Sequence, residues 1–154
     1  MRIRLLAVGR PRDPGLAALH DAYAARIVRL GASYRSSWVP EEKLGGRYTD
    51  EHVREREGKK IRDSLEGPET VVALDPGGRL LASTELPPLL ERWAAREVVL
   101  VVGGPSGLHA TVLERAGFRW SLSPLTFPHE MVRVLVAEQV YRALTLLRGV
   151  PYHR

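Results

Sequence analysis

The sequence contains no cysteine, and no apolar run in it approaches the roughly 18 residues that a membrane-spanning helix needs. The first absence excludes disulfides, thiolate nucleophiles and zinc sites with cysteine ligands. Residues 1–9 form a short apolar run with two arginines, and they lack the longer apolar stretch and small-residue cleavage site of a signal peptide. These absences predict a soluble, cytoplasmic protein without a membrane partner.

Lysine is also scarce: of the 23 basic residues only Lys43, Lys59 and Lys60 are lysines, and the others are arginines. Arginine makes forked contacts to phosphate and stacks on bases. A GC-rich genome or adaptation to heat explains the same skew. The formal net charge of +5 therefore permits a nucleic-acid partner without requiring one.

The remaining composition is that of a globular protein, with 154 residues, of which 44% are hydrophobic and 27% charged. These values exclude disorder, collagen and coiled coil. A chain of this length predicts one domain, residues 1–154, with a core that needs no disulfide or metal.

Strand and helix signals alternate along the chain. Short apolar runs bounded by glycine or proline predict strands, and apolar residues at three- and four-residue spacing predict helices. The strands are expected at 3–8, 33–39, 70–74, 97–102 and 118–122, and the helices at 15–30, 50–65, 84–95, 108–116 and 130–148. This alternation favours an α/β fold, a single mostly parallel sheet with helices on both faces.

Three loops follow strands at one predicted edge of this sheet: 74–78, 103–107 and 122–129. Together they hold five glycines and four prolines. Rigid, open backbone at the carboxyl ends of parallel strands suits a small cofactor, although each loop alone is typical of a tight turn. The loops match neither the dinucleotide nor the P-loop signature. The histidines have no metal-ligand spacing, so no metal is expected.

The last predicted helix has a broad apolar arc, and Arg133 falls inside this arc in the first turn. A core-facing arginine is costly unless it is paired. Two interpretations stay open. The guanidinium forms a buried pair with a carboxylate such as Asp75, or it contacts an anion or substrate at the mouth of the crevice.

The opposite side of the same helix carries large apolar residues among Glu138, Arg142 and Thr145. These apolar residues are Met131, Leu135 and Leu146. They predict a second buried face, and hence a helix-mediated homodimer.

The C-terminal residues Tyr152, His153 and Arg154 combine a stacking ring, a titratable ring and a guanidinium. This combination can grip an unstacked base and its phosphate. A frayed chain end is the alternative interpretation.

Five segments together resemble one known family. They are 102–107 (VGGPSG), 120–123 (WSLS), 125–129 (LTFPH), 132–143 (VRVLVAEQVYRA) and 151–154 (PYHR). The sequence resembles the RlmH (YbeA-type) family of ribosomal large-subunit pseudouridine N3-methyltransferases, in the SPOUT superfamily. The resemblance spans the whole chain, and it is dense from residue 71 onward and thin across residues 10–70.

The resemblance implies a SPOUT fold with a C-terminal trefoil knot, S-adenosyl-L-methionine as cofactor, and an active site at a dimer interface. It implies a substrate similar to a pseudouridine in a 23S rRNA hairpin loop, methylated in the assembled ribosome. The implied cofactor residues are Leu74, Gly103, Gly104, Leu122, Ser123, Pro124, Leu125, Thr126 and Phe127. Pro124 lacks an N–H, so any cofactor contact through that group is lost here.

Methylation at N3 requires an imide to lose its proton, which places negative charge on the flanking carbonyl oxygens. Arg133 or Arg154 is expected to stabilise that charge, and His129 or His153 to take the proton. Tyr152 is expected beside the base. Glu138 is a weaker candidate, because it is expected to pair across the dimer.

Three other functions stay open. The chain could methylate a different RNA target, serve as a non-catalytic RNA-binding factor for ribosome assembly, or bind a small molecule through its glycine loops.

Overall fold

The computed structural model describes residues 1–43, 45–65 and 67–152. Within them, five strands form one sheet in the order β2-β1-β4-β3-β5, and every pair of neighbours is parallel. The strands are β1 (Arg2–Val8), β2 (Ser33–Val39), β3 (Thr70–Leu80), β4 (Val98–Val102) and β5 (Phe118–Ser121). The predicted α/β fold is confirmed.

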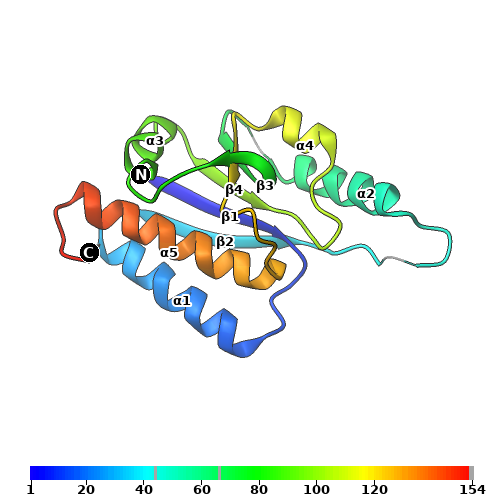
Figure 1. Ribbon diagram of the computed structural model, residues 1–154, viewed down its shortest axis with the longest axis horizontal. Helices are drawn as coiled ribbons and strands as arrows, with labels where there is room; N and C mark the ends of the chain where they lie inside the picture. The colour runs from blue at the N-terminus through cyan, green and yellow to red at the C-terminus, as the bar shows by residue number, and fades with distance from the viewer. Residues whose placement is uncertain (44, 66, 153–154) are drawn as a thin grey trace.

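Helices cover both faces of the sheet, as predicted (Figure 1). One layer consists of α1 (Pro14–Arg29), α3 (Leu86–Trp93) and α5 (His129–Leu147), and α5 packs against both other helices. The second layer consists of α2 (Asp50–Asp63) and the short α4 (Ala110–Arg115). No helix in the described ranges is long and apolar enough to span a bilayer.

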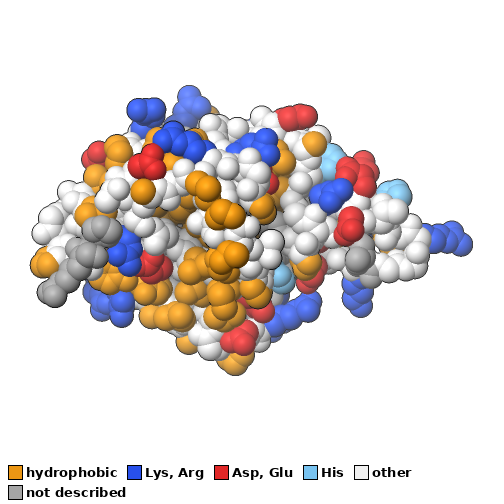
Figure 2. Space-filling model, viewed as in Figure 1, with side chains coloured by type: hydrophobic (Ala, Val, Ile, Leu, Met, Phe, Trp, Pro, Cys, Tyr) orange, Lys and Arg blue, Asp and Glu red, His pale blue; other side chains and the backbone are white. Residues whose placement is uncertain are grey.

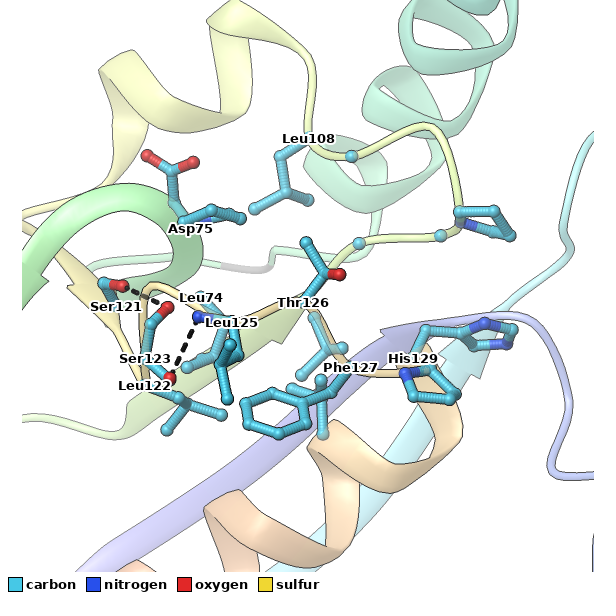
Figure 3. Close-up of a pocket in the computed structure, with 18 residues that line it drawn as sticks. Leu74, Asp75, Leu108, Ser121, Leu122, Ser123, Leu125, Thr126, Phe127 and His129 are labelled. Atoms are coloured by element: carbon cyan, nitrogen blue, oxygen red, sulfur yellow. Dashed lines mark hydrogen bonds between the residues drawn. The ribbon is translucent and has the colours of Figure 1, made fainter.

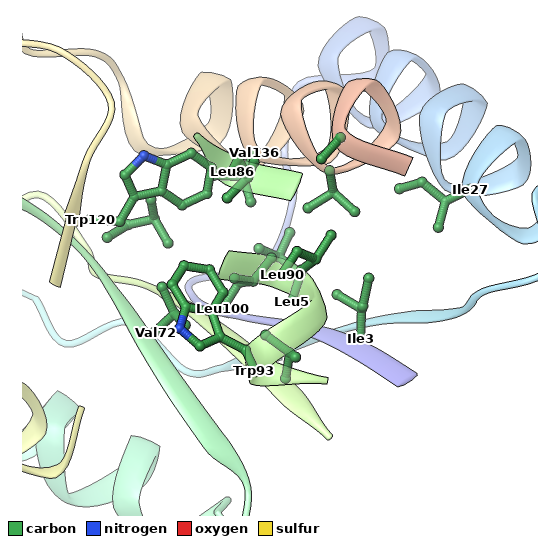
Figure 4. Packing of buried hydrophobic residues seen from close by; sticks show 14 of the residues in the cluster. Ile3, Leu5, Ile27, Val72, Leu86, Leu90, Trp93, Leu100, Trp120 and Val136 are labelled. Atoms are coloured by element: carbon green, nitrogen blue, oxygen red, sulfur yellow. The ribbon is translucent and has the colours of Figure 1, made fainter. Parts of the chain in front are cut away.

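The central strand β4 shows why the sheet needs a helical layer on each side. All five of its residues are buried apolar side chains, and successive side chains of a strand point to opposite faces. Val98, Leu100 and Val102 join the core under α1, α3 and α5, where Trp93 and Trp120 also pack (Figure 4). Val99 and Val101 join a smaller core under α2 and α4.

Strand β3 extends beyond residue 74, where the sequence analysis predicted its end. Residues 75–78 were expected to form a loop after the strand, yet the strand resumes and pairs with β5 through Leu80. Leu74 and Arg79 both lie opposite Trp120, so the four residues between them bulge out of the ladder. A Cβ on Gly78 would lie 2.6 Å from the backbone of Arg119, which explains the glycine at this close approach.

Helix α5 is buried over more of its circumference than the sequence indicated. Thr145, expected on the outer side, is fully buried, because α5 packs between α1 and α3 over the sheet. Met131 stays 38% exposed, and Leu135 and Leu146 are partly exposed. Only part of the predicted outer face is therefore free in a single chain.

Candidate functional site

A hollow in the described part of the chain lies at the carboxyl ends of β3, β4 and β5. It is a cavity of about 660 Å³ lined by residues from three segments, 74–76, 102–108 and 121–132. Figure 3 shows these segments converging, with Leu108 above and Phe127 below. They include parts of all three loops that the sequence analysis placed at one sheet edge, and the volume is within the range of small-molecule sites.

Most of the residues that the resemblance assigns to the cofactor line this cavity. They are Leu74, Gly103, Gly104, Leu122, Ser123, Leu125, Thr126 and Phe127. Pro124 is exposed and is not part of the lining. Leu108 and Val132 also line the cavity, and no loop signal marked either of them.

The glycine loop 103–107 forms a tight turn closed by a hydrogen bond from the Gly107 N–H to the Gly104 carbonyl, 2.9 Å long. Gly107 has φ +84°, which glycine adopts without strain. A Cβ on Gly103 would lie 3.0 Å from the Gly107 backbone and 3.1 Å from Leu108. Because Gly103 has no Cβ, the turn can close this tightly, and its residues line the cavity.

The opposite wall is the segment 122–128, which is held by its own serines. The Ser121 hydroxyl donates to the Ser123 carbonyl (3.2 Å), and the Leu125 N–H donates to the Ser123 Oγ (3.0 Å), as Figure 3 shows. Leu125 remains 70% exposed at the mouth. The cavity thus has apolar walls, ordered backbone and an open rim.

His129 lines the cavity at the first residue of α5, and Arg133 follows one helical turn later. Arg133 is 4% exposed, and its Nη2 donates to the carbonyls of Val8 (2.8 Å) and Gly9 (2.5 Å). The proposed partner Asp75 is wrong, because Asp75 pairs with Arg119 at 2.5 Å. The Nε of Arg133 is buried without a partner in the described residues.

Glu130 fixes the start of α5 to the segment that follows β1. Its carboxylate accepts the N–H of Arg12 at 2.5 Å and that of Asp13 at 3.3 Å. These backbone hydrogen bonds hold the pKa of Glu130 below its ordinary value, the bond from Arg12 contributing most. Arg133 and Glu130 together therefore determine where His129 lies.

Tyr152 lies at the other end of α5. Its hydroxyl donates to Glu138 at 3.1 Å, and its ring meets Tyr141 edge-on at 4.7 Å between centroids. Glu138 also accepts from Arg142 at 2.6 Å, so its partners here lie within the chain. At about 1.5 Å per residue, Glu138 is about 14 Å along the helix from His129. One chain does not bring Tyr152 to the cavity, and His153 and Arg154 lie outside the described residues.

A residue that the sequence analysis missed supports the glycine loop from behind. Glu57 of α2 is 1% exposed, and its Oε2 would be 3.1 Å from a Cβ on Gly104. Its Oε1 accepts the N–H of Glu42 at 2.9 Å, while Oε2 has no hydrogen-bond partner in the described residues. The signal was present: Glu57 lies midway between the apolar Val53 and Ile61, at i+4 spacing on the same face.

Glu57→Gln is expected to make stability less dependent on pH. Burial raises the pKa of Glu57, and the Glu41 carboxylate adds to the rise. A carboxyl with a higher pKa in the folded chain costs stability when it ionises, so the unfolding free energy falls as pH rises above the ordinary value of 4.5. At pH values at which Glu57 is ionised in the folded wild type, the variant should be more stable than the wild type.

Urea unfolding midpoints at a series of pH values would measure this effect. Glu55→Gln, at an exposed position of the same helix, is the matched control and should follow the wild-type curve. Parallel curves for the wild type and Glu57→Gln would contradict the assignment.

No group of three or more His, Asp or Glu side chains in the described ranges is arranged to hold a metal ion.

The chain is similar to known proteins over almost its whole length. A family model described as "Predicted SPOUT methyltransferase" matches residues 1–153. The chain is 46% identical over 158 residues to a protein of Alkalilimnicola ehrlichii named "Ribosomal RNA large subunit methyltransferase H", covering 100% of this chain and 99% of that one. A protein of the same name from Gloeobacter violaceus is 44% identical over 154 residues, covering 99% of each chain.

A solved structure has the same fold. It is a probable methyltransferase from Bordetella pertussis, with a TM-score of 0.53 and 18% identity, covering 93% of this chain and 94% of that one. At this identity the likeness concerns the fold alone.

Proposed function

The chain belongs to the SPOUT methyltransferase family, and on that premise we propose that it methylates large-subunit ribosomal RNA with S-adenosyl-L-methionine. The proposed target is N3 of a pseudouridine in a 23S rRNA hairpin loop of the assembled ribosome, which also makes the protein cytoplasmic. The observation that carries the proposal is the cavity whose lining includes eight of the nine residues that the resemblance assigns to the cofactor.

The residues of the cavity fit this cofactor. S-adenosyl-L-methionine supplies an electrophilic methyl group on a sulfonium. The main-chain groups of Gly103 and Gly104 suit the polar edges of such a molecule, and Leu74, Leu122 and Phe127 suit the faces of its adenine ring. Ser123, Leu125 and Thr126 complete the wall.

His129 is the residue we assign to proton removal. It lines the cavity, and an imidazole can accept a proton near neutral pH. Arg133, one turn behind it, adds a fixed positive charge in surroundings from which water is excluded. That charge favours the imide anion that precedes methylation. His153 and Arg154 are the alternative base and cation.

A homodimer would complete the site. Two α5 helices packed antiparallel about a two-fold axis would place the partner's Tyr152 near this chain's His129. Figure 2 shows hydrophobic side chains gathered in the middle of the face that carries α5. Two large apolar side chains near the start of this helix, Leu125 and Met131, are 70% and 38% exposed. A monomeric mass by light scattering at micromolar concentration would contradict this arrangement.

A trefoil knot is part of the same proposal. The segment 122–128 leaves the edge strand β5 and arrives beside the end of β1, where His129 would be 3.8 Å from a Cβ on Gly9. Such a path crosses β3 and β4 close to the glycine loop, as threading through a loop would require.

The test is transfer of labelled methyl groups from S-adenosyl-L-methionine to ribosomes from a strain that lacks its own enzyme. We expect label in one hairpin nucleotide of 23S rRNA, and a much lower rate on protein-free 23S rRNA. Cofactor binding without any label would indicate a different RNA target. The absence of both cofactor binding and label would favour a non-catalytic RNA-binding factor.

A further inference from the structure

The loop between β2 and α2 extends away from the body of the molecule (Figure 1). We call its described residues 40–43 and 45–49 the arm. It begins at the carboxyl end of β2. Because the strands are parallel, this is the same end of the sheet as the one that carries the cavity. The mechanism proposed above does not use the arm.

The arm ends in an ordered turn. The Tyr48 N–H donates to the Gly45 carbonyl at 3.4 Å, and Gly45 and Gly46 have φ of +138° and +65°. Thr49 then caps α2, accepting the N–H of His52 while the His52 ring accepts from the Thr49 N–H. Arg47 and Tyr48 therefore lie between the hydrogen bond that closes the turn and the capped start of α2.

The Tyr48 ring is supported and still accessible. The Arg56 guanidinium carbon lies 5.2 Å from the ring centroid, and the His52 ring meets it edge-on at 6.5 Å. Tyr48 nevertheless remains 49% exposed. A supported aromatic ring with a free surface is a platform on which an unstacked base can lie.

The charges around the arm leave two cations free. Glu41 pairs with Arg12 (3.1 Å) and Glu42 with Lys60 (2.5 Å), so the arm's carboxylates are engaged. Lys43 and Arg47 are exposed and have no ion pair among the described residues. In Figure 2, Lys or Arg side chains project at the end of the molecule where Figure 1 has the arm.

We propose that the arm is a second RNA contact, in which Lys43 and Arg47 bind backbone phosphates and Tyr48 stacks on an unpaired base of ribosomal RNA. The inference rests on the proposed function, which identifies ribosomal RNA as the partner. It adds a second place at which the protein contacts the ribosome, apart from the target nucleotide. Free cations beside an aromatic platform match single-stranded RNA. A protein partner would favour fewer charged residues at the centre of the contact.

The arm is also connected to the cofactor loop. The Glu42 N–H donates to Glu57, which lies behind Gly104, and the Ser106 hydroxyl donates to Asp50 at 2.7 Å. RNA bound at the arm would therefore be held at a fixed position relative to the cavity.

The experiment measures ribosome binding by the full-length protein as a function of salt, separately from methyl transfer. The double variant Lys43→Gln/Arg47→Gln is expected to bind about tenfold more weakly at physiological salt. The slope of log affinity against log salt should shrink by about 0.7 to 0.9 for each phosphate contact removed. Tyr48→Ala should also weaken binding about tenfold, and Tyr48→Phe should restore it, because stacking needs only the ring.

The control is Arg92→Gln/Arg96→Gln, which removes two exposed charges next to the amino end of β4. It should leave affinity close to wild type, and all variants should keep wild-type affinity for S-adenosyl-L-methionine. Arm variants that bind like the wild type would overturn the proposal. Weaker binding with an unchanged salt slope would also overturn it, because that result indicates a ribosomal protein as the contact.

The two proposals can fail separately. A wild-type protein that binds ribosomes through the arm but transfers no methyl group would refute the function and keep the arm. A wild-type protein that transfers methyl groups, with arm variants that bind ribosomes as well as it does, would keep the function and refute the arm. A wild-type protein without affinity for ribosomes would overturn both.

Discussion

Gly103→Val is expected to raise the dissociation constant of S-adenosyl-L-methionine about a hundredfold while the chain stays folded. A Cβ at this position would lie 3.0 Å from the Gly107 backbone and 3.1 Å from Leu108, and valine adds two further methyl groups. Overpacking of this kind costs roughly 1–3 kcal/mol, and about 2.7 kcal/mol is a hundredfold in affinity. The loop can relieve the contact only by moving, and the space it lines is the proposed cofactor site.

Isothermal titration with the cofactor would measure this change, with thermal unfolding to confirm the fold. Gly117→Val is the matched control, since the nearest atom to its Cβ is 3.8 Å away and Gly117 does not line the cavity. Wild-type affinity in Gly103→Val would show that the cofactor binds elsewhere.

Arg133→Ala is expected to lower turnover at least tenfold more than it lowers cofactor affinity. The variant removes a buried charge one turn behind His129, together with the donor that satisfies the Val8 and Gly9 carbonyls. Each buried carbonyl left without a partner costs about 1–3 kcal/mol, so the unfolding free energy should fall by about 3 kcal/mol. Arg133→Lys should recover part of the stability, because an ammonium can donate to one of the carbonyls.

Single-turnover methylation of ribosomes and cofactor titration, on the same preparation, separate the two effects. Arg29→Ala removes an exposed arginine from α1 and should change neither quantity. Equal losses of turnover and affinity in Arg133→Ala would assign this residue to binding alone. His153→Ala is expected to act in the same direction on turnover.

The fold and the place of the cavity could be predicted from the sequence because both depend on local patterns. The alternation of apolar runs determines which segments become strands, and parallel strands bring their following loops to one edge. The predicted break at Asp75–Gly78 was wrong because local turn signals do not show that Arg79 and Leu80 pair with β5.

The features of the site that could not be predicted from the sequence depend on contacts between distant segments. Nothing near Arg133 in the sequence indicates that its donors reach the end of β1, or that Asp75 is already paired with Arg119. The separation of Tyr152 from His129 follows from the length of α5 and from the way the tail folds back on Glu138. Such distances become visible only when the chain is folded.

The bonds that anchor α5 also set the order in which the protein becomes active during synthesis. The bonds of Arg133 and Glu130 join residues that are 125 and 118 positions apart, and α5 follows the other described helices in the chain, so it is made after them. Because closing such long loops is slow, refolding should be limited by docking of this helix. A nascent chain that ends before residue 129 lacks His129 and Val132 of the cavity lining and the bonds that Glu130 and Arg133 make to the end of β1 and the segment after it, so the site is complete only after α5 has docked.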